Sequence, residues 1–241
     1  MQRRESHFGS EYREHATARN GQVVTLRTVQ PTDKDMLARA LSHLSPHSRY
    51  LRFFCNKSQF TAAELRYLTE LDGQQHFALA AVRAGANGDD DGLGIARFVR
   101  LVNEPTVAEA AVAVVDEMQR QGLGKLLFLR LAAAARERGI ERIRSEILPE
   151  NVAIRALIRE LVPDAKQHQD GQSIIVEAAL PAVGPAEDLD LIAERGTTYR
   201  LLALAAGDAL QLRQPGCAPE PHQAPAPAAE PVPPEGSSGQ R

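Results

Sequence analysis

Tryptophan is absent from this chain of 241 residues, and aromatic residues make up only 5% of it. No apolar run approaches the roughly 20 residues of a membrane-spanning helix, so we expect no membrane partner. The two cysteines lie far apart, and the seven histidines show no metal-ligand spacing, so neither a disulfide framework nor a metal site is predicted. The first residues carry mixed charges rather than an apolar leader, and we expect a cytoplasmic protein.

An excess of positive charge is also missing. Lys and Arg number 28 against 31 Asp and Glu, which gives a formal net charge of -3. Proteins that bind nucleic acid by bulk electrostatics are normally strongly basic, so no nucleic-acid partner is expected. The chain does contain enough apolar residues for a packed core, at 43% of the sequence, and most of them are aliphatic.

Composition divides the chain into four regions. Residues 1–21 are polar and charged without a hydrophobic period, which predicts a loose N-terminal arm. Residues 22–181 alternate between strand-like and helix-like periods and form the expected domain. Residues 182–213 form an extension with a helix expected at Tyr199–Leu212. Residues 214–241 contain eight of the fifteen prolines, and this Pro/Ala-rich tail is predicted to be disordered.

Within the domain, the order of the predicted elements indicates the fold class. A strand is followed by helices, one with Ser45-Pro46 at its start and one with a capping box from Thr61 to Glu64. Three close-set strands, a long helix, a strand, a helix and a final strand follow, at His76–Arg83, Gly94–Val102, Val107–Val115, Leu123–Arg138, Arg142–Leu148, 151–161 and Ser173–Leu180. Short connections imply antiparallel neighbours, so the pattern predicts an α/β (α+β) fold with a mixed, mostly antiparallel sheet flanked by helices.

The most informative segment is a glycine-bearing turn between the third of the close-set strands and the long helix. Gly122 and Gly124 lie where that helix begins, and Arg120 and Lys125 flank them. The first N–H groups of a helix have no intrahelical acceptor and carry the positive end of its dipole. Glycine lets a phosphate approach this backbone, so the turn predicts a phosphate-binding site, although a plain tight turn is the alternative.

Two common phosphate loops do not match this segment. A P-loop requires Ser or Thr after its lysine, and Leu126 stands there. A dinucleotide-binding loop would have a third glycine at Leu127 and would lie in the first unit of a parallel sheet. The remaining pattern is Gln-x-x-Gly-x-Gly, at Gln119, Gly122 and Gly124.

This pattern, in its β-loop-α context, resembles the acyl-CoA pyrophosphate loop of the GCN5-related N-acetyltransferase (GNAT) superfamily. The order of elements over about residues 22–181 is also that of the family. The resemblance implies acetyl-CoA as co-substrate and no metal. It further implies contacts to the pantetheine arm from the backbone of Val114 and Val115 and from Asn151, which is equally an ordinary N-cap. The implied pyrophosphate-binding residues are Gln119, Arg120, Gln121, Gly122, Leu123, Gly124 and Lys125.

A closer resemblance is to the bacterial GNAT domains that acetylate protein lysines. It is carried by residues 45–54 (SPHSRYLRFF), 77–81, 94–100 and 108–114. It implies a lysine or another primary amine as acceptor, with Glu109 as general base, whereas a solvent-facing charge near the strand end is the alternative reading. The tyrosine that many members use to protonate the thiolate is replaced by Ile158.

Three questions stay open at this stage. A small-molecule amine acetyltransferase and a catalytically weak acyl-CoA sensor are the alternatives to a protein acetyltransferase, and an oligomer is compatible with the sequence. Arg49, Tyr50, Arg52, Phe53 and Phe54 either wall the acceptor site or form the packing face of an amphipathic helix. Glu146 is either a second carboxylate at the site or an exposed charge on a strand.

Overall fold

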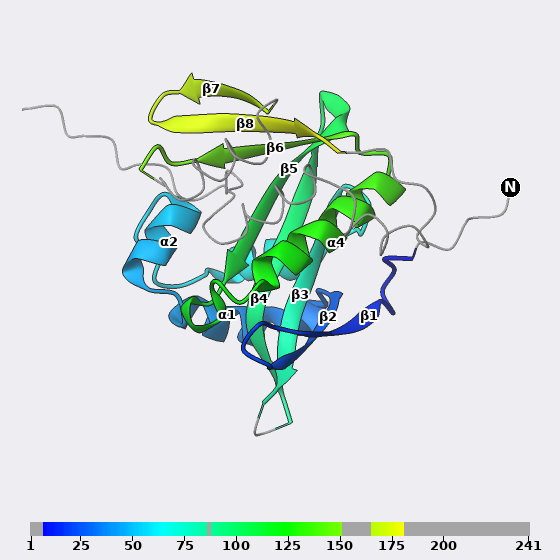
Figure 1. Cartoon of the computed structure of the whole chain (residues 1–241), viewed down its shortest axis with the longest axis vertical. Helices are drawn as coiled ribbons and strands as arrows, with labels where there is room; N and C mark the ends of the chain where they lie inside the picture. Colours follow the sequence, from blue (N-terminus) through cyan, green and yellow to red (C-terminus); the bar gives the residue numbers. More distant parts are fainter. Residues whose placement is uncertain (1–6, 86–87, 151–164, 181–241) are drawn as a thin grey trace, which may run out of the picture.

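The computed structural model describes residues 7–85, 88–150 and 165–180. Eight strands form one sheet in the order β1-β2-β3-β4-β5-β6-β8-β7 (Figure 1). Only β5 and β6 pair in parallel, and every other pairing is antiparallel, as predicted. The strands are β1 (Arg13–Thr17), β2 (Val23–Thr28), β3 (His76–Ala84), β4 (Asp90–Leu101), β5 (Glu104–Val114), β6 (Arg142–Ile147), β7 (Lys166–Asp170) and β8 (Ser173–Ala179).

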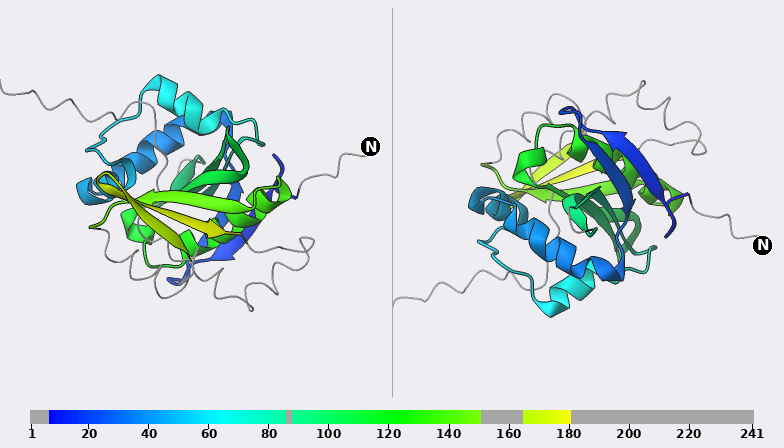
Figure 2. Two further views of the ribbon diagram at one scale, coloured as in Figure 1. Left: turned by 90° about the horizontal axis from the view of Figure 1, so that it is seen from above. Right: turned by 90° about the horizontal axis from the view of Figure 1, so that it is seen from below.

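Four α-helices of the described residues cover the two faces of this sheet. They are α1 (Lys34–Ser42), α2 (Pro46–Phe53), α3 (Ala62–Thr69) and α4 (Leu123–Glu137), and short 3-10 turns occupy Pro31–Asp33 and Asp116–Met118. Seen from above, α1, α2 and α3 lie on one side of the sheet and α4 on the other (Figure 2). The helix starts follow the sequence signals, because Ser45 Oγ accepts from Ser48 N and the Thr61–Glu64 capping box is formed.

Alternation along β4 and β5 assigns side chains to the two faces. Ala96 and Phe98 of β4 join the core beneath α4, as do Ala108, Ala110 and Val112 of β5. The residues between them point to the α1–α3 face, because successive side chains of a strand alternate. On that face Arg97 lies under the Tyr67 ring of α3, with 4.6 Å from its Cζ atom to the ring centroid.

The expectation of a loose N-terminal arm is wrong from His7 onward. Residues Arg13–Thr17 form β1, which pairs along its length with β2. Phe8 is only 1% exposed in the core beside α4, and Glu14 forms a bidentate ion pair with Arg130 of α4 at 2.7 Å. The polar sequence of β1 hid this strand, because an edge strand with one face toward solvent needs few apolar residues.

The remaining differences concern the C-terminal half. Strand β7 was not predicted, and all five of its residues are exposed, so no hydrophobic pattern marks it. The strand expected at Gly94–Val102 is longer, since β4 already begins at Asp90. The helix expected at 151–161, the helix at 199–212 and the Pro-rich tail lie outside the described residues.

The junction of β5 and β6 is the feature that positions the site. Their parallel pairing covers only three residue pairs and ends at Glu109↔Arg144. Beyond that point β5 continues to Val114 and β6 to Ile147 without pairing, apart from a bond from Ser145 Oγ to the Ala110 carbonyl at 3.3 Å. Figure 1 shows β6, β8 and β7 crossing β5 at a steep angle. The sheet therefore opens along the C-terminal part of β5.

Candidate active site

The glycine turn leads directly into α4, as predicted. Gly122 is the N-cap in the left-handed conformation, with φ +83°, which favours glycine because it has no Cβ atom. The first helical bond runs from Leu126 N to Gly122 O at 3.1 Å, and no side chain caps the helix. The N–H groups of Gly122, Leu123, Gly124 and Lys125 thus precede the hydrogen-bond ladder and lie at the positive end of the helix dipole, an arrangement that can bind an anion.

The loop before α4 is held by its own polar side chains. Asp116 accepts from Ser45 N at 3.0 Å and from Gln119 Nε2 at 3.1 Å, which ties the loop to the start of α2. Gln119 Nε2 also lies 3.3 Å from the Val114 carbonyl and 3.4 Å from Ser48 Oγ. The Gln119 side chain therefore fixes the loop against β5 and α2, a contribution that the sequence motif did not reveal.

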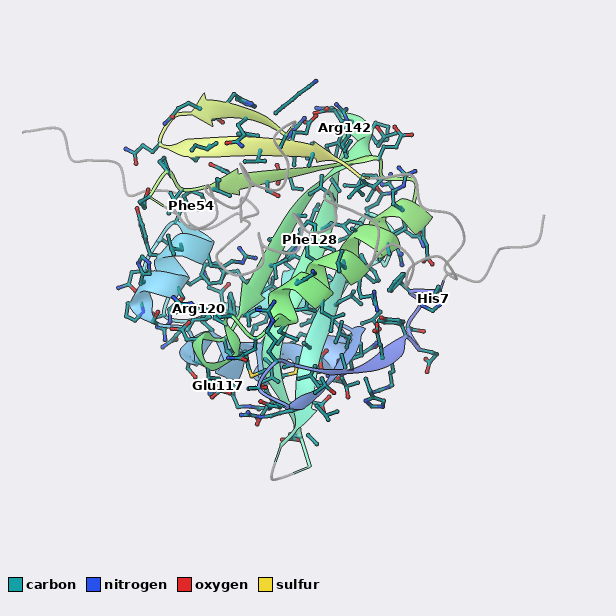
Figure 3. The ribbon with its side chains drawn as sticks, viewed as in Figure 1. His7, Phe54, Glu117, Arg120, Phe128 and Arg142 are labelled. Carbon is teal, nitrogen blue, oxygen red and sulfur yellow. The ribbon has the colours of Figure 1, made fainter. Side chains whose placement is uncertain are left out.

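Three cations surround the helix terminus. Arg120 is exposed, has φ +60° and lies with Glu117 on the loop leading into α4 (Figure 3). Lys125 is half-buried in the first turn of α4. Arg19, from the β1–β2 turn, donates its backbone N–H to Gln121 O at 3.0 Å, and its Nε lies 3.7 Å from the position of a Cβ on Gly122. The segment predicted to be a loose arm thus supplies a cation to the loop.

The open edge of β5 is the second part of the site. Val115 N bonds to Leu93 O, so in an antiparallel ladder the odd-numbered residues of this stretch bond to β4 and the even-numbered ones face the other edge. Val112 therefore presents its backbone N–H and C=O groups to the opening beyond Glu109, and Val114 presents its N–H, while the Val114 carbonyl accepts from Gln119 Nε2. Val115 also accepts from Met118 N at 2.9 Å. Both of its backbone groups thus have a partner within the protein, so ladder parity favours Val112 beside Val114 at the open edge, and the expected contact of Val115 with a ligand stays a prediction.

Glu109 lies where the two strands begin to diverge. It is the last residue of β5 that pairs with β6, and it is partly buried. Its register partners are Val99 on β4 and Arg144 on β6, and alternation places its side chain on the α1–α3 face. Glu146 belongs to a different contact, since its carboxylate accepts from Ser173 Oγ on β8 at 2.5 Å.

A pocket lies on the same face, beside the C-terminal end of β5. It is lined by residues of α1, α2, α3 and β4, by Phe60 and by residues 113–115 at and just beyond the end of β5, and its polar members are Arg52 and Arg97. Their side chains are almost fully buried, with residue exposures of 4% and 1%. Burial lowers the pKa of Arg52 to about 9, with a smaller contribution from the nearby Arg97 charge, and burial lowers that of Arg97 to about 10. From its sequence context, Arg52 fits either the wall of the acceptor site or the packing face of a helix. Arg97 is a pocket residue that the sequence did not predict.

Two predicted site features fall outside the part of the chain that the structure describes, namely Asn151 and the Ile158 substitution. Within residues 7–85, 88–150 and 165–180, no cluster of His, Cys, Asp and Glu has the arrangement of a metal site. In the same residues, no helix combines the length and apolar character of a membrane span.

A glycine-capped helix terminus beside an unpaired strand edge defines an acyl-CoA-binding fold of the N-acyltransferase class. The family model described as the acetyltransferase (GNAT) family matches residues 41–161, which is half of the sequence. The chain belongs to this family, whose members use acetyl-CoA.

Individual relatives support this assignment. Over 143 residues the chain is 33% identical to acetyltransferase Pat of Mycolicibacterium smegmatis, covering 59% of this chain and 42% of that protein. Over 138 residues it is 29% identical to acetyltransferase PA5475 of Pseudomonas aeruginosa, covering 57% of this chain and 73% of the relative. The structure of the GNAT domain of S. lividans PAT aligns with a TM-score of 0.63 and 24% identity, over 72% of this chain and 99% of that one. The chain thus spans less than half of the Mycolicibacterium relative, and the structural likeness concerns the fold.

Proposed function

We propose that this protein transfers the acetyl group of acetyl-CoA to a primary amine, with a protein lysine as the first acceptor to test. The observation that carries the proposal is the juxtaposition of the uncapped α4 terminus with the unpaired edge of β5. The helix terminus suits a phosphate, and the strand edge suits an extended chain with amide groups. Coenzyme A contains both, as its pyrophosphate and its pantetheine arm. The likeness to acetyltransferase Pat supports the protein acceptor.

Each part of the site has its own role in binding acetyl-CoA or in the transfer. The N–H groups of Gly122 to Lys125 bind the pyrophosphate, assisted by the charges of Arg19, Arg120 and Lys125. The backbone of Val112 and Val114 binds the pantetheine amides as an added strand would. Glu109, at the fork, accepts a proton from the acceptor ammonium, whose usual pKa near 10.4 leaves it charged at neutral pH. The amine nitrogen then forms a bond to the acetyl carbon, and the carbon–sulfur bond breaks to release CoA.

The cofactor half of the proposal is tested by calorimetry with acetyl-CoA and with free CoA. Gly124 is buried at the first turn of α4, so Gly124→Glu adds both bulk and negative charge at the phosphate site. We expect CoA affinity to fall at least thirtyfold, about 2 kcal/mol or more. Ala38→Glu, on the exposed side of α1, is the control and should leave affinity unchanged. Equal affinity in the wild type and Gly124→Glu would place CoA elsewhere.

The chemical half is tested by measuring thiol release with protein and small-amine acceptors. We expect Glu109→Gln to lower kcat at least a hundredfold, in keeping with loss of a general base, while acetyl-CoA affinity stays unchanged. Glu141→Gln, an exposed carboxylate just before β6, is the matched control. Tight CoA binding without turnover on any amine would identify an acyl-CoA sensor, and turnover on small amines alone would exclude a protein acceptor.

A further inference from the structure

The pocket on the α1–α3 face combines a mostly apolar lining with two buried arginines. Apolar side chains from α1, α2 and the following segments, including Met36, Leu37, Leu41, Phe53 and Phe60, make up most of its wall. The cavity measures about 60 Å³, where roughly 10–15 Å³ suffices for one water molecule. It therefore has room for a small organic group and not for a nucleotide or a folded peptide.

Two guanidinium groups complete this wall, and several of their N–H groups lack an acceptor. The Nε and Nη1 atoms of both Arg52 and Arg97 are buried and have no hydrogen-bond partner. Arg97 also contacts Tyr67, both at the ring and through a side-chain hydrogen bond, and its Nη2 atom lies against Nε2 of His76. Arg52 lies 5.0 Å from the centroid of the Phe53 ring. None of these partners carries a negative charge that would balance two buried cations.

A third buried arginine on the same face shows what a satisfied arrangement looks like. Arg27 is 7% exposed and makes two bonds of 2.8 Å to Asp33. Its Nε and Nη2 atoms also donate to Asp90, at 3.1 and 2.9 Å. The fold therefore pairs a structural arginine fully with carboxylates. Arg52 and Arg97 differ because their free N–H groups meet at a cavity, and buried polar groups normally have partners.

We propose that this pocket is a subsite for a carboxylate carried on a short apolar arm, which Arg52 and Arg97 bind through their free N–H groups. A planar carboxylate matches the fork of a guanidinium, and two such forks favour it over a single weak acceptor. The apolar wall favours a hydrocarbon arm over an inorganic anion, whose other oxygens would find no donors there. The inference rests on the proposed function for its role, although the binding itself does not require CoA.

The position of the pocket ties this subsite to the transfer reaction. Gly94, Val114 and Val115 line it, and Val114 also faces the opening where the pantetheine arm is expected to end. A carboxylate in the pocket therefore lies beside the acyl group that is transferred. Two sources fit this chemistry: the far end of a dicarboxylic acyl group on CoA, or a carboxylate on the acceptor amine.

The binding claim is tested on the full chain without CoA by calorimetry and thermal unfolding with butyrate and, at equal ionic strength, its neutral analogue butyramide. We expect butyrate to bind and to raise Tm, whereas butyramide does neither. Arg52→Met and Arg97→Met should each weaken butyrate binding at least tenfold, and Arg39→Met, an exposed residue on α1, should leave it unchanged. Equal effects of butyrate and butyramide would overturn the subsite.

The stability of the variants separates binding from a structural role. Without ligand, Arg52→Met should unfold at the same temperature as the wild type or higher, because a buried cation without a counter-charge is removed. A lower Tm together with unchanged butyrate affinity would show that Arg52 serves packing alone and overturn the proposal. Arg52→Lys and Arg97→Lys keep the charge but lose the fork, and each should retain the fold while weakening butyrate at least threefold.

Turnover then distinguishes the two sources. If the acyl group carries the carboxylate, Arg52→Met lowers kcat/KM for succinyl-CoA at least tenfold relative to acetyl-CoA, whichever acceptor is used. If the acceptor carries it, the variant raises KM for a carboxylated amine relative to its amide at least tenfold, and KM for acetyl-CoA is unchanged. Equal losses for all four substrates would overturn the subsite, whereas absence of CoA binding by the wild type would instead refute the proposed function.

Discussion

The two faces of the sheet are built from the same strands and yet differ in character. Beneath α4, strands β4 and β5 contribute only apolar side chains to a closed core, together with Leu127, Phe128 and Leu131 of the helix. On the α1–α3 face the alternate residues of those strands include Arg97 and Glu109, and β2 adds Arg27. Beside these charged groups, a smaller apolar cluster packs under α1 and α3.

The difference shows how the fold combines a rigid support with a reactive face. The α4 face fixes the helix whose terminus binds phosphate, so tight packing there determines the position of the loop. The opposite face contains charged groups that a stability argument alone would not place inside a protein, since buried charge is costly. The buried charged side chains thus lie on the α1–α3 face, where substrate chemistry is proposed, and the face that holds α4 in position is apolar.

The largest expected effect tests the apolar face. Phe128 is fully buried in the core under α4, and Phe128→Ala leaves a cavity there. We expect the free energy of unfolding to fall by about 3–5 kcal/mol in urea denaturation. Leu126→Ala, at a half-buried position of the same helix, should cost less than half as much. Similar losses for both variants would mean that α4 is not anchored mainly by its buried side.

The next effect tests the polar face through Asp33, which is 5% exposed and pairs with Arg27. Asp33→Ala leaves the Arg27 charge with only Asp90, whose side chain is 37% exposed. We expect a loss of about 2–3 kcal/mol, somewhat below the 3–5 kcal/mol of a fully orphaned buried charge. The double variant Arg27→Met with Asp33→Ala should recover part of this loss. A double variant that is less stable than Asp33→Ala would contradict the account.

A smaller effect follows from His76, which lies against Arg97. Burial, and secondarily the Arg97 charge, lower the pKa of His76 to about 3, whereas its value in the unfolded chain is near 6.5. Between these values the unfolded state binds the additional proton, so stability is unaffected above pH 6.5 and decreases as the pH falls toward 3. Allowing for partial exposure, we expect a loss of roughly 1 kcal/mol at pH 5.

The measurement for His76 compares urea denaturation at pH 7 and pH 5 in the wild type and in His76→Gln. The variant should lose less stability on acidification, because it lacks the proton that favours unfolding. His168→Gln, on the fully exposed strand β7, should behave as the wild type. If the wild type and His76→Gln respond alike to pH, another group governs acid stability.

The smallest expected effect concerns the surface. Lys34 and Glu70 form an ion pair at 2.7 Å, and their side chains are 34% and 48% exposed. Because water and salt screen such a pair, Lys34→Ala should change the free energy of unfolding by no more than about 0.5 kcal/mol. A loss above 1 kcal/mol in urea denaturation would show that surface charge matters more here than the buried contrast between the two faces.

Periodicity and local signals were enough to predict most of the fold. Capping residues and turn glycines identified the helix starts around Ser45, Thr61 and Gly122, because these depend on neighbouring residues alone. Strands β1 and β7 were missed because their residues are polar edge positions, stabilised by a partner strand far away in sequence. Pairing of that kind is not encoded in a local pattern.

The site was predictable to the extent that it is local. Gly122 and Gly124 predicted the phosphate loop, because the loop and its helix are adjacent in the sequence. The approach of Arg19, the bonds of Asp116 and the meeting of Arg52 with Arg97 depend on the tertiary fold, and no spacing in the sequence signals them. One hint was available: Arg97 lies between apolar neighbours, Ala96 and Phe98, in the interior of a strand. Which backbone groups of residues 112–115 face the open edge is also hidden from the sequence, because ladder parity is decided by pairing with Leu93.

The hydrogen bond from Arg19 N to Gln121 O has a consequence for how the protein folds during its synthesis. It joins two positions about a hundred residues apart, and Phe8 and Glu137 form a second link of this kind. A nascent chain on the ribosome therefore cannot complete the loop before α4 until α4 has left the exit tunnel, because contacts of long sequence separation form late. Until then β1 lacks its final neighbours, so synthesis of α4 completes the N-terminal hairpin and the loop together.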